Sequence, residues 1–249
     1  MTPERMADHW WWRPGWRPGR RMYTWHFTFD DAPQVRDLAA RYQTRLAALP
    51  GLDLIPARWL HLTTQGVGFT DEVSDSDVAT IINAARRRLA TLSAAPVTLG
   101  PARITPEAIL LDVTPIAGLT AIRAGLRAAI GDVWPAGRIP ETEDWTPHVS
   151  VAYSNTTAPA EPYAAALADH REFTESLIGS VQLIVIGRDQ HMYEWTTRAE
   201  IRMSLPTDIE AERRPELASV PPGDGRAGRS ASRRAGESAR RLTGRSGRS

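Results

Sequence analysis

The chain has 249 residues, 42% apolar and 24% charged, which is enough to bury a core without disulfides or a structural metal. It contains no cysteine, which excludes thiol nucleophiles, iron–sulfur clusters, disulfide scaffolds and Cys-ligated zinc. All 30 basic residues are arginine, and 10 of them lie in residues 206–249 against 6 acidic residues. Residues 1–205 therefore carry a net charge of −3, which gives no broad surface for binding long nucleic acids.

The apolar runs of the sequence predict neither a membrane-spanning helix nor a signal peptide. No apolar run approaches the 18 residues that a membrane-spanning helix needs, so we expect no membrane partner. The start of the chain does not resemble a signal peptide, because its apolar block (10–12) is short and Arg13 follows it. Together with the lack of cysteine, these features predict a cytoplasmic protein.

Residues 1–21 form a segment rich in tryptophan and arginine. Two Arg-Pro-Gly tripeptides, at 13–15 and 17–19, predict turns. The segment holds Trp10, Trp11, Trp12 and Trp16. These tryptophans could cover the edge of a core, or they could form a platform on which bases stack.

Residues 22–205 alternate strand and helix patterns. We expect strands at 23–29, 59–65, 96–103, 107–114, 148–153, 180–187 and 192–203, and helices at 33–49, 78–92, 116–130 and within 160–177. Several strand pairs are too close in sequence for a crossover helix between them, so the fold class is predicted as α+β with antiparallel sheets.

Residues 206–249 lose this apolar periodicity and are rich in Arg, Gly, Ser and Pro. Such a composition buries too little apolar surface to offset the entropy of ordering, so we expect a disordered tail. The tail could simply be solvated, or it could tether RNA weakly through its arginines.

A repeated His-x-Ser/Thr pattern is the clearest chemical signal. In the strand over 59–65, alternation places His61 and Thr63 on one face, with leucines on the other. The strand over 148–153 repeats the arrangement with His148 and Ser150. If the two strands face each other across a cleft, they present two imidazoles and two hydroxyls to one ligand.

Phosphodiester chemistry needs this set of groups. One histidine can take a proton from the attacking hydroxyl or water while the other donates a proton to the leaving alkoxide. The two hydroxyls can donate to the non-bridging phosphate oxygens, where negative charge builds. No metal or other cofactor is required, and the sequence has no convincing carboxylate cluster to hold a metal.

The two motifs resemble the His-x-Ser/Thr-hydrophobic tetrads of the 2H phosphoesterase superfamily, in particular its 2′-5′ RNA ligase-like and cyclic phosphodiesterase branch. The tetrad at 148–151 fits fully, whereas the tetrad at 61–64 departs at Thr64, where the family prefers an apolar residue. Thr64 faces the packed side, so we interpret the departure as a local packing change. The similarity covers residues 22–205 and leaves out the Trp-rich start and the basic tail.

This resemblance implies a bilobal α+β fold, with two antiparallel sheets that face a central groove and helices outside. It implies acid–base hydrolysis of 2′,3′-cyclic phosphates on RNA ends or nucleotides, or of ADP-ribose cyclic phosphate, and some members form 2′-5′ linkages by the reverse reaction. The expected partner is an RNA end or a small cyclic nucleotide, bound by a monomer. Which histidine is the acid and which is the base stays open.

Other residues near the motifs are weaker candidates. His26 and Thr28 match the same pattern, so His26 competes with His61 for the first tetrad and could line the groove. Gln65 is expected on the face of His61 as a polar contact, and Trp145 could stack on a base or form an apolar lid. Alternation places Tyr153 opposite His148, which predicts a packing role. We assign no function to His9 or His170, and we expect His191, with Tyr193 and Trp195 on the last strand, to be structural.

Two alternatives belong to other functional classes. The chain could be a non-catalytic RNA-binding module that keeps the groove and uses the tail for affinity. It could also hydrolyse a phosphodiester that is not part of a nucleic acid, in the same groove. Intact histidines in both tetrads favour an enzyme over a binding module.

Overall fold

The computed structural model describes residues 2–135, 138 and 145–205. Within them, the helices are α1 (Pro33–Leu46), α2 (Asp75–Leu89), α3 (Ala117–Gly131) and α4 (Glu161–Leu167). The strands are β1 (Met22–Thr28), β2 (Leu52–Leu54), β3 (His61–Phe69), β4 (Ala95–Ile104), β5 (Ala108–Thr114), β6 (His148–Ser154), β7 (Thr174–Ile178), β8 (Ser180–Gly187) and β9 (Glu194–Arg202). The tail at 206–249, where we predicted disorder, lies outside the described residues.

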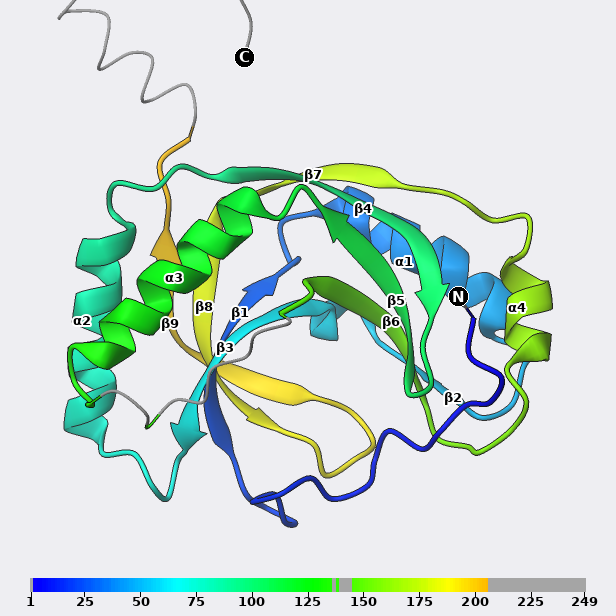
Figure 1. Cartoon of the computed structure of the whole chain (residues 1–249), viewed down its shortest axis with the longest axis horizontal. Coiled ribbons are helices and arrows are strands. Elements are labelled where there is room, and N and C mark those ends of the chain that lie inside the picture. The colour runs from blue at the N-terminus through cyan, green and yellow to red at the C-terminus, as the bar shows by residue number, and fades with distance from the viewer. Residues whose placement is uncertain (1, 136–137, 139–144, 206–249) are drawn as a thin grey trace, which may run out of the picture.

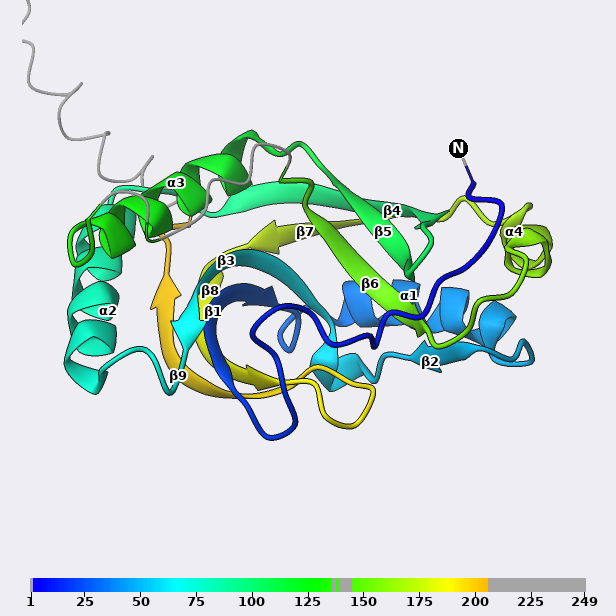
Figure 2. The ribbon, with the colours of Figure 1, turned by 60° about the horizontal axis from the view of Figure 1, so that its bottom comes forward.

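Two antiparallel sheets divide the molecule into two lobes. The first sheet has the order β3-β1-β8-β9 and is strongly curled, and the second has the order β2-β6-β5-β4-β7 (Figure 2). Helices α2 and α3 lie together at the end of the molecule that holds the first sheet, whereas α1 and α4 lie at the other end (Figure 1). The expected bilobal α+β architecture is therefore confirmed. No helix among the described residues is long and apolar enough to cross a membrane.

The helices form where the apolar spacing predicts them. In α1, residues three and four apart are buried, and Pro33 stands in the first turn, where its missing N–H costs nothing. The hydroxyl of Tyr42 on α1 donates to the carbonyl of Glu172, 2.8 Å away, and so fixes the helix on the second lobe. Helix α2 begins three residues before the expected helix over 78–92, because the side chain of Ser74 caps it by accepting a hydrogen bond from the backbone N–H of Asp77.

Two strands are missed by sequence reasoning. Strand β2 has only three residues, and β7 has five, with a charged residue among them. Both lie at the edges of the second sheet, where one side of the strand lacks a partner and polar residues are tolerated. Their alternation is too short to be recognised next to the longer central strands.

Bulges in the two tetrad strands reverse the expected faces of two side chains. In β3, Thr63 pairs with His26 and Gln65 pairs with Trp25, so Thr64 is an extra residue. In β6, Val151 is extra in the same way, because Ser150 and Ala152 pair with consecutive residues of β5. Each bulge shifts the alternation by one residue. Gln65 therefore joins the face of Trp25, and Tyr153 joins the face of Ser150, which corrects both sequence-based placements.

Residues 5–21, which we call the strap, pack against both lobes. The backbone N–H groups of Met6 and His9 donate to the carbonyls of Ala158 and Ser154, each at 2.8 Å, which ties the strap to the second lobe. At its other end, Arg20 pairs with Asp71 in the first lobe. In Figure 2 the strap is the dark-blue segment that runs from beside β6 to beside the β8–β9 hairpin.

The four tryptophans of the strap have different surroundings. Trp10 is buried, as expected if the segment covers the edge of the core, and its indole N–H donates to Asp53 at 2.7 Å. Trp11 and Trp12 are each 47% exposed, and Trp16 is half-buried. The segment is thus part of the folded body rather than an appendage to it.

Candidate active site

A cavity of about 400 Å³ lies between the two sheets, where β3 and β6 approach each other. The four tetrad side chains named from the sequence all line it: His61 and Thr63 from β3, and His148 and Ser150 from β6. Each tetrad stands at the start of its strand. The two strands come from different sheets, so the groove brings together groups that are 87 positions apart in the chain.

The two tetrad histidines are fixed by the same kind of hydrogen bond. Nδ1 of His61 lies 2.8 Å from the carbonyl oxygen of Trp59, and Nδ1 of His148 lies 2.8 Å from that of Thr146. A carbonyl oxygen can only accept, so Nδ1 of each ring carries the proton. Nε2 is then the nitrogen of each ring that remains to gain or lose a proton.

The environment of His61 favours its neutral form. Burial lowers the pKa of His61 to about 4, against the opposing effect of the Trp59 carbonyl, and the nearby His148 lowers it further. His61 is therefore neutral at pH 7, and its Nε2 can accept a proton. His148 is half-buried, at a more open position of the groove.

A third imidazole lies against the first tetrad. His26 on β1 is opposite Thr63, and its ring stacks on that of His61 with 4.6 Å between centroids and 6° between planes. His26 lines the groove, but its Nδ1 is buried without a hydrogen-bond partner. Burial, with a smaller contribution from His61, lowers its pKa well below the usual value. Thr28, which completes the pattern with His26, does not line the groove.

The sequence model of the 2′-5′ RNA ligase superfamily matches residues 29–190, about two thirds of the chain and both tetrads. The chain belongs to this superfamily of 2H phosphoesterases. Membership supports a phosphoesterase enzyme that acts on a phosphodiester. The strap, β1 with His26, and the basic tail lie outside the matched residues.

Solved structures show the same fold at low sequence identity. TT0787 of Thermus thermophilus is 18% identical, with a TM-score of 0.57 over 75% of this chain and 99% of that chain. E. coli LigT complexed with phosphate is 13% identical, with a TM-score of 0.53 over 74% of this chain and 98% of that chain. No curated protein matches the chain in a sequence search.

Two residues that we expected at the groove of this 2H phosphoesterase lie elsewhere. The side chain of Gln65 accepts a hydrogen bond from Arg127 on α3 at 2.9 Å and does not line the groove. Trp145 does not line it either, since its indole N–H donates to the carbonyl of Thr63 at 3.1 Å and Arg123 lies 5.2 Å from its ring. Of the three expected contact residues, only His26 reaches the cavity.

Sequence reasoning missed several groove residues, among them His9 and Tyr153, which are both buried. The ring of His9 stacks on Tyr153 at 4.3 Å, and its Nε2 lies 3.1 Å from the hydroxyl of Tyr193. Burial lowers the pKa of His9 to about 4 and raises that of Tyr153. Strand alternation would have found Tyr153 if the bulge at Val151 had been foreseen. No local pattern points to His9.

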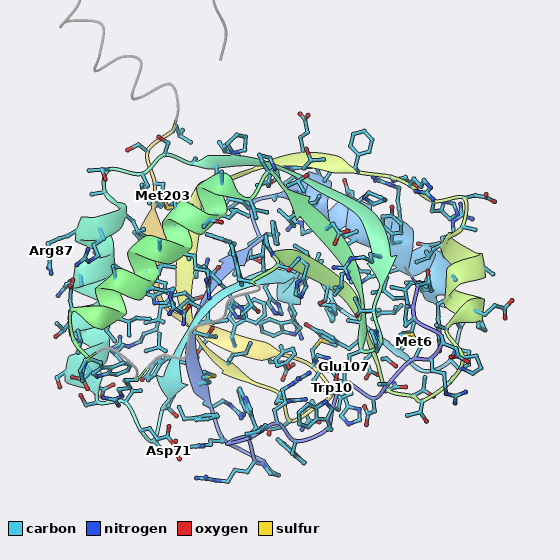
Figure 3. The ribbon with its side chains drawn as sticks, in the orientation of Figure 1. Met6, Trp10, Asp71, Arg87, Glu107 and Met203 are labelled. Atoms are coloured by element: carbon cyan, nitrogen blue, oxygen red, sulfur yellow. The ribbon has the colours of Figure 1, made fainter. Side chains whose placement is uncertain are left out.

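An ion pair stands at the edge of the groove near His9. Burial opposes ionisation of Glu107, but hydrogen bonds from the Trp11 indole and the Arg13 guanidinium outweigh it and lower the pKa of the carboxyl. Nη2 of Arg13 lies 2.5 Å from Oε2 of Glu107. In Figure 3, the labelled Trp10 of the strap lies beside the labelled Glu107, which belongs to the turn between β4 and β5. Among the described residues, no three His, Asp or Glu side chains are grouped to hold a metal ion.

Proposed function

We propose that this chain is a metal-independent phosphodiesterase that opens the 2′,3′-cyclic phosphate of an RNA end or a nucleotide. The observation that carries the proposal is that two His-x-Ser/Thr tetrads from different sheets line one groove. In both, a backbone carbonyl holds Nδ1, so that Nε2 is the nitrogen available to substrate. Both tetrads belong to one chain, so we expect residues 2–205 to act as a monomer.

His61 serves as the general base in this mechanism, because its buried imidazole is neutral at pH 7. Its Nε2 takes a proton from water as the water oxygen bonds to phosphorus. The phosphorus–oxygen bond to one ribose oxygen breaks, and His148 donates a proton to that oxygen. The product is a phosphate monoester with a free neighbouring hydroxyl. In the reverse direction, which forms a phosphodiester, the two histidines exchange roles.

The hydroxyls of Thr63 and Ser150 stabilise the negative charge on the non-bridging oxygens. His26 adds a third donor beside them. Because a buried N–H without a partner is rarer than a buried acceptor without one, the proton of neutral His26 belongs on Nε2 rather than on the orphaned Nδ1. The Nε2–H group then faces the groove as an uncharged donor next to Thr63.

The substrate class draws support from two sources. The net charge of −3 over residues 1–205 favours a terminal or small phosphate over a long RNA track. E. coli LigT, which shares the fold, has been crystallised in complex with phosphate and with 3′-AMP.

A substrate panel in EDTA tests the proposal. It contains 2′,3′-cyclic mononucleotides, RNA oligomers with a 2′,3′-cyclic end, ADP-ribose cyclic phosphate, a 2′-5′-linked dinucleotide and a phosphodiester without a nucleoside. We expect turnover of cyclic nucleotides in wild type and its loss in His148→Ala, with products assigned as 2′- or 3′-phosphates. RNA binding without turnover of any substrate would identify a non-catalytic module instead. Activity that disappears in EDTA and returns with a divalent ion would contradict the metal-free mechanism.

A further inference from the structure

The two Arg-Pro-Gly tripeptides of the strap form two consecutive tight turns. In the first, the N–H of Trp16 donates to the carbonyl of Arg13 at 3.0 Å, and Gly15 has a φ of +81°. In the second, the N–H of Arg20 donates to Arg17 at 3.1 Å. Proline followed by a glycine with positive φ is the pattern of a type II turn. These turns determine where the strap presents its side chains.

The turns place Trp16 at the groove. The ring of Trp16 packs edge-on against that of Phe69, with 5.2 Å between centroids. The guanidinium carbon of Arg20 lies 3.6 Å from the centroid of the same Phe69 ring. Trp16 is half-buried and lines the cavity that contains the tetrads. The superfamily model matches residues 29–190, so Trp16, which lies outside the match, adds a side chain to the groove of this chain.

A row of aromatic rings connects the first tetrad to the strap. The ring centroid of Tyr193 lies 6.1 Å from that of His61, and the ring centroid of Tyr153 lies 5.4 Å from that of Tyr193. His9 follows, stacked on Tyr153. All of these side chains line the same cavity. Flat rings therefore line the cavity from the first tetrad to the strap.

A buried arginine holds this part of the strap in place. Arg188 is 3% exposed and donates to the carbonyl of His9 at 2.9 Å. Its guanidinium lies 5.5 Å from the ring of Trp10 and 5.6 Å from that of Tyr193. A buried cation surrounded by ring faces and bonded to backbone fixes the strap relative to the β8–β9 hairpin.

We propose that Trp16 and Tyr193, which both line the cavity, form a compartment for the nucleobase of a nucleotide whose phosphate lies at the tetrads. This inference rests on the proposed function and specifies its substrate. Aromatic faces stack on any base, because every base has a π face. The compartment is unsuited to a second phosphate, since Arg13, the arginine that lines it, is already paired with ionised Glu107.

The test compares a 2′,3′-cyclic mononucleotide with ribose 2,3-cyclic phosphate, which lacks the base. Stacking on an aromatic side chain is worth about 1–3 kcal/mol per base, so we expect wild type to favour the nucleotide by about tenfold or more in kcat/KM. Trp16→Ala should lose most of this preference and leave turnover of the base-free substrate unchanged. Tyr193→Leu is the second variant, which removes the other ring. Trp12→Ala, an exposed tryptophan of the same strap that does not line the cavity, is the matched control.

Each outcome decides between the two proposals. Equal rates on both substrates in wild type would overturn the compartment and leave the phosphodiesterase intact. A Trp16→Ala variant that slows both substrates equally would also overturn it, since the strap would then only support the groove. Failure to hydrolyse either substrate would overturn the proposed function, and the compartment with it. Thermal unfolding of each variant shows that the comparison is made between folded proteins.

Discussion

The two tetrads share a motif and a backbone hydrogen bond, yet their surroundings differ. His61 is buried, stacks on His26 and has a pKa lowered to about 4, whereas His148 is half-buried at the more open wall. Motifs that are equivalent in sequence therefore hold imidazoles in unequal environments. General acid and general base need opposite protonation states at the start of a reaction, so under the proposed mechanism this inequality favours His61 as the base in hydrolysis, which the motif does not specify.

Replacement of either tetrad histidine should have the largest effect on turnover. His61→Ala and His148→Ala should each reduce turnover of a 2′,3′-cyclic nucleotide by roughly 10²–10⁴-fold, because each removes one proton-transfer step. The double variant should lose far less than the product of the two, since the pair acts as a unit. Steady-state kinetics on all three variants makes the measurement. A His61→Ala variant with near-normal activity, beside an inactive His26→Ala, would show that the first tetrad is misassigned.

The burial of His61 predicts a loss of stability in acid. Its pKa is about 4 in the folded state and about 6.5 when unfolded, so the unfolded chain binds the extra proton first. Stability is therefore lost as pH falls below 6.5, by roughly 2–3 kcal/mol from this group at pH 4.5. Urea unfolding at pH 7.5 and pH 4.5 measures the loss.

Two variants separate this contribution from those of the other buried histidines. His61→Gln should reduce the difference between the two pH values, because glutamine does not titrate. Thr63→Val alters the same face of β3 without removing a titratable group, so it should keep the wild-type difference. An unchanged pH dependence in His61→Gln would mean that the imidazole is not held neutral by burial.

A smaller effect separates two roles of His26. His26→Phe keeps a flat ring against His61 but removes the Nε2–H donor, whereas His26→Ala removes both. If the donor contributes one hydrogen bond to the substrate, both variants should lose up to about tenfold in kcat/KM. If only stacking matters, His26→Phe should behave as wild type. The pH dependence of kcat in both variants shows whether His61 is affected indirectly.

Removal of the tail is expected to have no effect on a small substrate. The groove residues and strands named above all belong to the described residues, and the composition of the tail predicts disorder, so a 1–205 chain should fold and turn over a cyclic mononucleotide at the wild-type rate. On an RNA oligomer at low salt, the ten arginines of the tail should give the full chain a salt-dependent advantage. Lost mononucleotide activity would show that the tail packs into the body. Equal behaviour on both substrates would remove the tethering role.

The sequence predicts the long central elements and the tetrads well, because long alternation and helical spacing are strong signals. The prediction of which face a side chain occupies fails where a bulge adds one residue to a strand. Bulges at Thr64 and Val151 move Gln65 out of the groove and Tyr153 into it, and nothing in the local composition announces either bulge. In these two strands, alternation counted from the histidine therefore predicts the correct face for the first three residues and not beyond.

Long-range packing accounts for the other differences. His9 reaches the groove only because the strap crosses from one lobe to the other, and that path depends on partners such as Ser154 and Arg188, more than 140 positions away. Trp10 is buried and Trp12 is exposed, although both lie in the same short apolar block. Tertiary contacts, rather than local pattern, distinguish them.

The carbonyl oxygens that hold the two histidine rings have an evolutionary consequence. Both acceptors belong to the main chain, at Trp59 and Thr146, so no side-chain substitution at those positions removes them. In many active sites a carboxylate orients the histidine, and a single mutation can invert the tautomer. Here the tautomer is robust to mutation as long as the two strands keep their course. Side chains around the groove can then change while the proton stays on the same nitrogen.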